Sequence, residues 1–262
     1  MNKKFITNFI FYLICLAFIS GCASQPLELK EGDTLRVGVC LDYPPVIYED
    51  NGQITGIEAD LAQYAANRLG VKIEFVELPF EDLTSYLEDD EIDVIMSGMA
   101  NTDYRKEDVR FIEPYMTIGQ MALVRKNDEE NFSSHNKLYE SNLRVGYIES
   151  TTGEMFVNEN IPAGEKIGFL NPEKGIEELK NNEIDVFFDD APFVLQAVKN
   201  NPSLSALGWL FTTEHLAWAV SKDETRDELY NKLNDVILHA RQSGDLRKIL
   251  NKYFEIQINI KK

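Results

Sequence analysis

The chain of 262 residues has few of the side chains that carry covalent or metal chemistry. It holds three cysteines and three histidines. The histidines stand far apart, without the close spacing of metal ligands: His135, His215 and His239. No glycine-rich phosphate loop, serine-nucleophile elbow or calcium-binding run is present in the sequence. We therefore expect neither a metal nor an organic cofactor.

Positive charge is also scarce. The chain has 26 Lys and Arg against 44 Asp and Glu, which gives a formal net charge of −18. Nucleic acids and anionic membrane surfaces attract proteins with a positive net charge, so the body of this protein is not expected to bind either. With 44% apolar and 27% charged residues, the composition is that of a globular chain with one large domain or two modest ones.

Only one long apolar run occurs, at residues 9–18, just after two lysines. It is too short for a comfortable membrane span and small residues follow it, so residues 1–21 are predicted to be an export signal peptide. Residues 19–22 (Ile-Ser-Gly-Cys) resemble a bacterial lipobox, which implies cleavage before Cys22 and lipidation of its thiol. The alternative is an ordinary secretory signal followed by a disulfide between Cys22 and Cys40.

Under the lipoprotein prediction, Cys15 is removed with the signal peptide and no disulfide framework remains. Residues 22–33 are polar without periodic pattern and are predicted to form a lipidated tether. No later apolar run is long enough to span a membrane, which argues against a transmembrane receptor.

Two short motifs occur twice, in the same order. Residues 35–38 and 143–146 are both Leu-Arg-Val-Gly, and residues 91–94 and 183–186 are both Glu-Ile-Asp-Val. A single recurring tetrapeptide can arise by chance, but two matched pairs in one order indicate duplication. The sequence therefore predicts two lobes built on one plan.

The hydrophobic pattern around these motifs alternates between strand and helix. The first half predicts strands at residues 35–41, 72–78 and 92–96, with helices at 57–69 and 80–87. The second half repeats this order, with strands at 143–148 and 184–188 and helices at 152–158 and 172–180, before two C-terminal amphipathic helices. Such alternation is typical of an α/β fold with parallel sheets.

Ligands of open parallel sheets bind beyond the carboxyl ends of the strands, near helix N-termini. The residues that follow the predicted strands therefore deserve most weight. Residues 97–102 and Arg105 follow one strand, residues 149–152 form a hydroxyl-rich helix start, and residues 189–192 follow another strand. An arginine, a helix N-terminus and a carboxylate in one cleft are the parts needed to hold a zwitterion.

With these residues, the chain resembles the amino-acid-binding members of the bacterial extracellular solute-binding proteins, over residues 35–254. Each matching segment alone is weak evidence for the family, but the order and spacing of the segments together are specific for it. The matching positions are residues 35–38, 43–45, Gly56, 60–62, 92–95, 97–99, Thr102, Arg105, Phe111, 114–115, 150–152, 185–186, Asp190, Pro192, 244–246 and 252–254.

The resemblance implies a type II periplasmic-binding-protein-like fold, with two α/β lobes joined by two hinge strands that close on the ligand. Residues 34–119 and 217–256 would form lobe I, and residues 120–216 lobe II. The chain would cross between the lobes near residues 119–124 and return near 216–220.

The implied function is an extracytoplasmic substrate-binding lipoprotein that captures an amino acid and delivers it to the permease of an ABC importer. It would be a monomer, held at the membrane through its lipid anchor, in the periplasm or at the outer face of the cell membrane. Two alternatives stay open: a dehydratase acting on prephenate or arogenate on the same fold, and a ligand-sensing lipoprotein. For the dehydratase, Glu149 and Asp189 are the candidate acids, and neither has an evident partner.

The resemblance also implies roles for individual residues. Arg105 would grip the α-carboxylate with Thr152, and Asp190 would accept the α-ammonium. The backbone groups of Gly98 and Ala100 would assist, although Ala100 replaces the family's usual Ser or Thr. Without the resemblance, Arg105 would be interpreted as a surface ion-pair partner, Thr152 as a helix cap and Asp190 as a solvated turn residue, as Asp189 is expected to be.

Tyr43 and Phe80 match the positions that flank the ligand side chain, although an isolated aromatic residue more often belongs to a core. Cys40 stands where binders of basic amino acids carry an acidic residue. This disfavours lysine, arginine or histidine as the ligand without excluding them, because Asp42 or Glu149 could reach the pocket. We therefore expect a polar or neutral amino acid.

Overall fold

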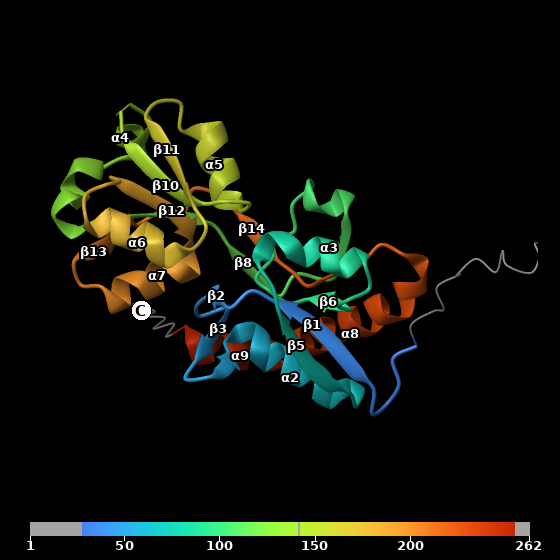
Figure 1. Cartoon of the computed structure of the whole chain (residues 1–262). Coiled ribbons are helices and arrows are strands. Elements are labelled where there is room, and N and C mark those ends of the chain that lie inside the picture. Colours follow the sequence, from blue (N-terminus) through green and yellow to red (C-terminus); the bar gives the residue numbers. More distant parts are fainter. Residues whose placement is uncertain (1–27, 141, 255–262) are drawn as a thin grey trace, which may run out of the picture.

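The computed structural model describes residues 28–140 and 142–254, which form two α/β lobes joined by a pair of strands (Figure 1). This arrangement confirms the predicted fold class. The predicted signal peptide, Cys22 and most of the predicted tether lie outside the described residues. Within the described ranges, no helix has the length and apolar character needed to cross a membrane.

Lobe I contains a five-stranded sheet with the order β5-β1-β6-β15-β7, in which β15 runs antiparallel to its two neighbours. The strands are β1 (Thr34–Val39), β5 (Lys72–Glu77), β6 (Val94–Ile95), β7 (Val109–Phe111) and β15 (Ala219–Ser221). A small antiparallel sheet lies beside it, made of β2 (Asp42–Tyr43), β3 (Ile47–Asp50) and β4 (Gln53–Thr55). Its helices are α2 (Ile57–Leu69), η1 (Phe80–Asp82), α3 (Leu83–Glu88), η2 (Arg105–Glu107), η4 (Glu224–Arg226), α8 (Asp227–Ser243) and α9 (Asp245–Tyr253).

Lobe II has the same kind of sheet, with the order β11-β10-β12-β9-β13 and β9 antiparallel to its neighbours. Its strands are β9 (Gln120–Arg125), β10 (Arg144–Ile148), β11 (Glu165–Phe169), β12 (Val186–Asp190) and β13 (Leu204–Ala206). Its helices are η3 (Lys126–Phe132), α4 (His135–Glu140), α5 (Thr152–Asn160), α6 (Pro172–Lys180) and α7 (Ala191–Asn200).

The two antiparallel strands β8 (Met116–Ile118) and β14 (Glu214–Leu216) connect the lobes (Figure 1). Both lie a few residues before the positions that the sequence suggested, because residues 120–125 and 219–221 already belong to the two large sheets. A Cβ at Gly119 would lie 2.2 Å from the carbonyl oxygen of Thr212. The two connections therefore approach closely at a point where only glycine fits.

The repeated motifs contact each other in the same way in both lobes. In lobe I, Arg36 donates two side-chain hydrogen bonds to Asp93, at 2.6 and 3.1 Å, and its backbone N–H donates a third at 2.8 Å. In lobe II, Arg144 makes the same three bonds to Asp185, at 2.8, 3.2 and 2.9 Å. Two-point pairing of this kind holds the two neighbouring parallel strands together and also fixes their register.

The glycine and isoleucine of the repeated motifs also meet in both lobes. A Cβ on Gly38 would lie 2.4 Å from Cδ1 of Ile92, and a Cβ on Gly146 would lie 2.6 Å from Cδ1 of Ile184. The glycine thus leaves room for the isoleucine side chain to cover the strand. In each lobe one Leu-Arg-Val-Gly segment and one Glu-Ile-Asp-Val segment thus hold two neighbouring strands together. We call the paired side chains, Arg36 with Asp93 and Arg144 with Asp185, the arginine–aspartate locks.

The sequence prediction differs from the structure at two helices. The predicted helix at residues 80–87 is divided into a 3₁₀ turn, η1, and a short helix, α3. Helix α7 was not among the predicted elements, although Pro192 stands in its first turn. Proline is tolerated in the first turn of a helix, where its missing N–H has no partner to lose, and α7 uses it there.

Candidate functional site

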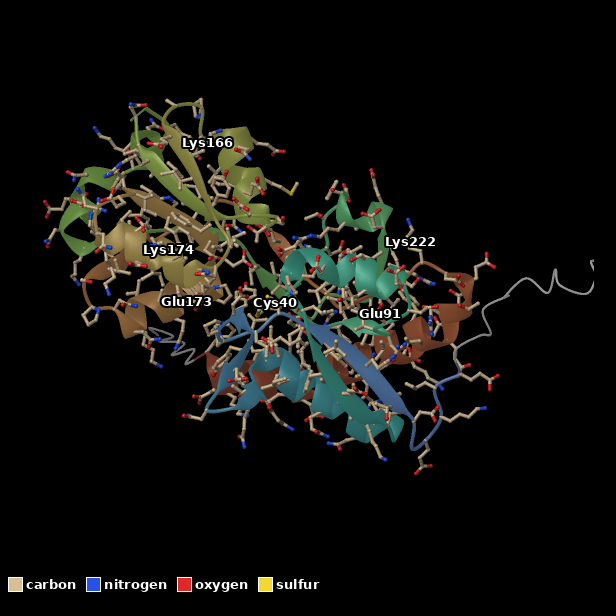
Figure 2. All side chains as sticks on the ribbon, in the orientation of Figure 1. Cys40, Glu91, Lys166, Glu173, Lys174 and Lys222 are labelled. Atoms are coloured by element: carbon tan, nitrogen blue, oxygen red, sulfur yellow. The ribbon has the colours of Figure 1, made fainter. Side chains whose placement is uncertain are left out.

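A cavity of about 300 Å³ lies between the two lobes. The seven residues predicted to bind a ligand all line it: Tyr43, Phe80, Gly98, Ala100, Arg105, Thr152 and Asp190. Cys40 lines it as well, and Figure 2 shows this residue where the lobes meet. Residues that are up to 147 positions apart in the sequence are thus brought to one place, and their role toward a ligand remains a prediction.

Arg105 lies in η2 of lobe I and reaches across to lobe II. Its Nη1 donates to the carbonyl of Ala100 (3.2 Å), and its Nη2 donates to the carbonyl of Ser150 in lobe II (3.3 Å). Its guanidinium carbon stands 5.1 Å from the centre of the Phe80 ring. Burial lowers the pKa of Arg105 and the nearby Asp190 raises it. Since arginine stays protonated even in such surroundings, the cavity contains a fixed positive charge.

Asp190 ends β12 in lobe II and faces lobe I. It accepts hydrogen bonds from the Tyr43 hydroxyl (2.5 Å) and from Nε2 of Gln120 (2.5 Å). Burial raises the pKa of Asp190 to about 7, with a further contribution from the charge of Glu214, and the Tyr43 bond, Arg105 and the Gln120 bond oppose that rise. The carboxylate is therefore ready to accept a cationic group, because its own charge is incompletely compensated.

Gly98 is held in place from behind the cavity by a buried acid. Its N–H donates to Glu58 (2.8 Å), which also accepts from the Tyr115 hydroxyl (2.5 Å) and from the Trp218 indole (2.7 Å). Burial raises the pKa of Glu58 to about 7, although these three bonds act in the opposite direction. Gly98 has φ +65°, and a Cβ there would lie 2.6 Å from the ring of Tyr43. Only the carbonyl of Gly98 is thus left to serve a ligand.

Ala100 presents its backbone differently. It forms an isolated antiparallel bridge with Leu216, and the bonds of that bridge are made by the residues on either side of it. In such a pair the N–H of the central residue points away from the partner strand. The Ala100 N–H is therefore available on the cavity side, while its carbonyl accepts from Arg105.

Thr152 is the first residue of α5, and its side chain belongs to a network at the back of the site. The Thr152 hydroxyl oxygen accepts from Nε2 of Gln120 (3.1 Å), the same nitrogen that donates to Asp190. The preceding Thr151 donates to the carbonyl of Ile148 (2.7 Å) and makes no capping bond to the helix. The N-terminus of α5 thus lies at the cavity without a side-chain cap, and helix N-termini commonly bind anions.

Tyr43 and Phe80 line the cavity while packing against the core. Tyr43 contacts the apolar clusters of both lobes, and Phe80 packs against the cluster around α3 in lobe I. Both interpretations made from the sequence, core residue and cavity wall, thus apply to each ring.

Sequence reasoning missed Gln120 and Glu58 and misplaced Asp189. Gln120 is buried at the start of β9 and touches both Thr152 and Asp190, and no spacing rule singles out the residue after a hinge. Glu58 gave no signal in the sequence, since an acid in the first turn of an amphipathic helix is ordinary, and only the structure shows that it is fully buried. Asp189 was expected to be solvated, yet it is half-buried and lines the cavity.

Within the described part of the chain, no group of three or more His, Cys, Asp or Glu side chains could hold a metal ion. Cys40 carries a free thiol that donates to Asp42 (3.2 Å). Two α/β lobes, two connecting strands and a cavity between the lobes together define a type II periplasmic binding protein.

The comparisons with known proteins identify the family. Residues 35–256 match the model of the bacterial extracellular solute-binding proteins, family 3, and the chain belongs to this family. A Neisseria gonorrhoeae protein named "Probable histidine-binding protein" is 32% identical over 255 residues, covering 92% of this chain and 93% of that protein. The L-cystine-binding protein TcyJ of Escherichia coli K12 is 28% identical over 229 residues, covering 87% of this chain and 85% of that one.

A solved structure agrees with these sequence matches. An ancestral arginine-binding protein bound to arginine superposes with a TM-score of 0.79 at 31% identity, covering 87% of this chain and all of that chain. The expected membership of the amino-acid-binding solute-binding proteins is therefore confirmed. Since the family is extracellular, the protein acts outside the cytoplasm.

Proposed function

We propose that the protein binds a free amino acid through both of its α-groups and presents it to an ABC importer. The observation that carries this proposal is the pair formed by Arg105 and Asp190. One comes from each lobe, both line a single cavity, and among the described residues neither forms a direct ion pair. An amino-acid zwitterion supplies the missing partner for each.

The donors and acceptors around this pair match the rest of the α-groups. The α-carboxylate would lie against Arg105, the Ala100 N–H and the N-terminus of α5 at Thr152, in line with the attraction of anions to helix N-termini. The α-ammonium would lie against Asp190 and the carbonyl of Gly98. Because the two charges come from different lobes, binding both requires the cleft to be closed.

A thermal-shift and calorimetry panel of the L-amino acids tests this proposal directly. A ligand that binds the folded protein raises its melting temperature, so at least one amino acid should do so at concentrations above its dissociation constant. The same amino acid lacking its α-carboxylate, a simple amine, should give no shift. Failure of every amino acid to bind would refute the proposal.

We propose that the protein is a binder and not a dehydratase. Of the two candidate acids, Glu149 is exposed at the rim of the cavity, and Asp189 accepts the N–H of Asp190 (2.7 Å). Neither is placed by a base or an orienting partner in the way general acid catalysis requires. Incubation with prephenate or arogenate should therefore yield no product above the uncatalysed background, and repeated turnover would support the enzyme instead.

We further propose that the mature chain is anchored through lipidated Cys22. This residue lies outside the described residues, and the proposal rests on the lipobox-like residues 19–22 and the apolar run before them. Replacing Cys22 by Ser should move the protein from the membrane to the soluble fraction. Retention in the membrane after that change would contradict the anchor, and a periplasmic soluble wild-type protein would do the same.

A further inference from the structure

The charges that line the cavity are strongly unequal. Arg105 and Asp190 would be occupied by the two α-groups of a ligand. Among the other described residues that line the cavity, none is basic and four carry carboxylates: Asp42, Glu81, Glu149 and Asp189. None of these four forms an ion pair with a Lys or Arg of the described chain. Glu81 and Glu149 are exposed at the rim, so water screens them, whereas Asp42 and Asp189 are half-buried.

Asp42 belongs to β2 in lobe I. It accepts a hydrogen bond from the thiol of Cys40 (3.2 Å). Burial raises the pKa of Cys40 to about 12, and the adjacent charge of Asp42 adds to the effect, so the thiol stays neutral. Cys40 therefore orients the Asp42 carboxylate without neutralising it. The negative charge that the sequence seemed to lack at position 40 is supplied two residues later.

Asp189 belongs to β12 in lobe II. Its Oδ1 accepts the N–H of Asp190 (2.7 Å), which is a local bond that brings no compensating charge. Burial raises the pKa of Asp189 well above its ordinary range, and the negative charges of Asp190, Asp42 and Glu173 raise it further. Asp42 thus acts on Asp189 from the opposite lobe. In this structure the two half-buried carboxylates therefore lie in each other's field.

We infer that the cavity selects an amino acid with a cationic side chain, whose distal positive group lies between Asp42 of lobe I and Asp189 of lobe II. The inference rests on the proposed function, because it takes the α-groups to be held by Arg105 and Asp190. A cation between Asp42 and Asp189 attracts both lobes at once and favours the ionised form of Asp189, whose pKa burial and the neighbouring carboxylates raise. A neutral side chain offers Asp189 no such partner, so the protonated form of its carboxyl is favoured and no ion pair with the ligand forms.

With this arrangement, the protein distinguishes charged from neutral ligand side chains when its two lobes close. The open protein presents Asp42 and Asp189 on separate lobes, where either one alone distinguishes poorly between charged and neutral side chains. Only the closed cleft applies both. The expectation of a neutral ligand, drawn from Cys40, is accordingly replaced by lysine or arginine as the favoured ligand class.

The test compares ligands of nearly equal shape and different charge. The affinities of arginine and of its neutral isostere citrulline are measured by calorimetry at pH 8 and low ionic strength, for wild type and for Asp42→Asn and Asp189→Asn. Asparagine keeps the acceptor that Cys40 or the Asp190 N–H requires and removes only the charge. Glu165→Gln, an exposed residue of β11, is the matched control for the change in net charge.

Wild type should prefer arginine to citrulline by at least tenfold, and each Asn variant should reduce that ratio severalfold, while Glu165→Gln leaves it unchanged. A wild-type preference for citrulline, glutamine or cystine would overturn the inference and leave the proposed function standing. Unchanged ratios in both folded Asn variants would overturn it too. If no amino acid bound at all, the proposed function itself would fall, and the inference with it.

Discussion

The two lobes share a scaffold and differ in what they present to the cavity. At the amino ends of their central strands, Arg36 with Asp93 in lobe I and Arg144 with Asp185 in lobe II make the same three hydrogen bonds. At the carboxyl ends the likeness stops. Lobe I supplies the cation Arg105 together with the carboxylates of Asp42 and Glu81, while lobe II supplies carboxylates alone, two of them adjacent at the end of β12.

Duplication constrains the parts of a binding protein that lie away from its ligand. The arginine–aspartate lock is far from the ligand and fixes the register of parallel strands, so the same solution serves both lobes. The ligand is not symmetrical, since an amino acid has an anionic end and a cationic end. The strand ends therefore differ between the lobes, and only lobe I places a cation, Arg105, opposite the carboxylate of Asp190 in lobe II.

The largest effect should come from removing either half of this charge pair. Replacing Arg105 by Ala or Asp190 by Asn leaves one ligand charge desolvated and unpaired, a loss of about 2–5 kcal/mol. This corresponds to roughly 30-fold to several-thousand-fold weaker binding in calorimetry. Phe80→Ala should lose far less, since that ring contributes packing. A folded Arg105 or Asp190 variant, checked by circular dichroism, that binds within a few-fold of wild type would exclude that residue from the clamp.

The two locks should differ in strength because they differ in burial. The Asp93 side chain is 5% exposed, and its loss leaves Nε and Nη2 of Arg36 and a backbone N–H without their acceptor, while Nη1 of Arg36 keeps the Glu91 carbonyl. Asp185 is 24% exposed, and one of its partners, Arg125, keeps Asp128 and two carbonyls. Asp93→Ala should therefore lower the free energy of unfolding by about 2–4 kcal/mol and Asp185→Ala by about 1–2 kcal/mol.

Denaturant titration, with hydrogen exchange to assign the loss to one lobe, measures both values. Asp227→Ala, which removes an exposed pair with Arg110, serves as control and should cost under about 1 kcal/mol. An equal or reversed order for Asp93 and Asp185 would show that burial does not distinguish the two locks.

The Asp190 carboxylate of lobe II should also make the affinity for the ligand depend on pH. In the free protein the pKa of Asp190 is about 7, so the carboxylate that receives the ligand ammonium is mostly protonated at pH 6 and ionised at pH 8. Affinity should therefore rise with pH through 7, by about tenfold between pH 6 and 8, in proportion to the ionised fraction. Asp190→Asn should remove most of this dependence. A wild-type affinity that is flat over the range, or falls as pH rises, would contradict the role given to Asp190.

Much of the fold and of the candidate site could be predicted from the sequence. Strand and helix periods, the paired tetrapeptides and the polar residues after each strand gave two α/β lobes and seven residues that now line one cavity. Those signals are local, and each is written in a few neighbouring residues. Gln120 and Glu58 could not be found this way, because their importance lies in partners 32 to 160 residues distant.

The charge of the pocket for the ligand side chain could not be predicted from one sequence position either. Position 40 alone suggested a neutral ligand, because a thiol stands there. The structure adds Asp42, whose carboxylate accepts from that thiol, and Asp189, which comes from the other lobe and lines the same cavity. A single position is a poor guide to selectivity when the pocket is assembled from two lobes.

The smallest expected effect concerns the one hydroxyl that the lobes do not share. Lobe II offers the side chain of Thr152 beside the proposed carboxylate site, whereas lobe I has Ala100, which offers only its N–H. Thr152→Ala removes one hydrogen-bonding group and leaves the N-terminus of α5 in place, so it should cost about 0.5–1.5 kcal/mol, or about 2- to 12-fold in affinity. Ala100→Ser should restore the missing hydroxyl in lobe I and tighten binding by no more than a few-fold. Calorimetry of the two variants and of their combination, which should return near wild type, measures this balance. If Thr152→Ala weakened binding as much as Arg105→Ala, the hydroxyl would be the main carboxylate donor, and the leading role given to Arg105 would fail.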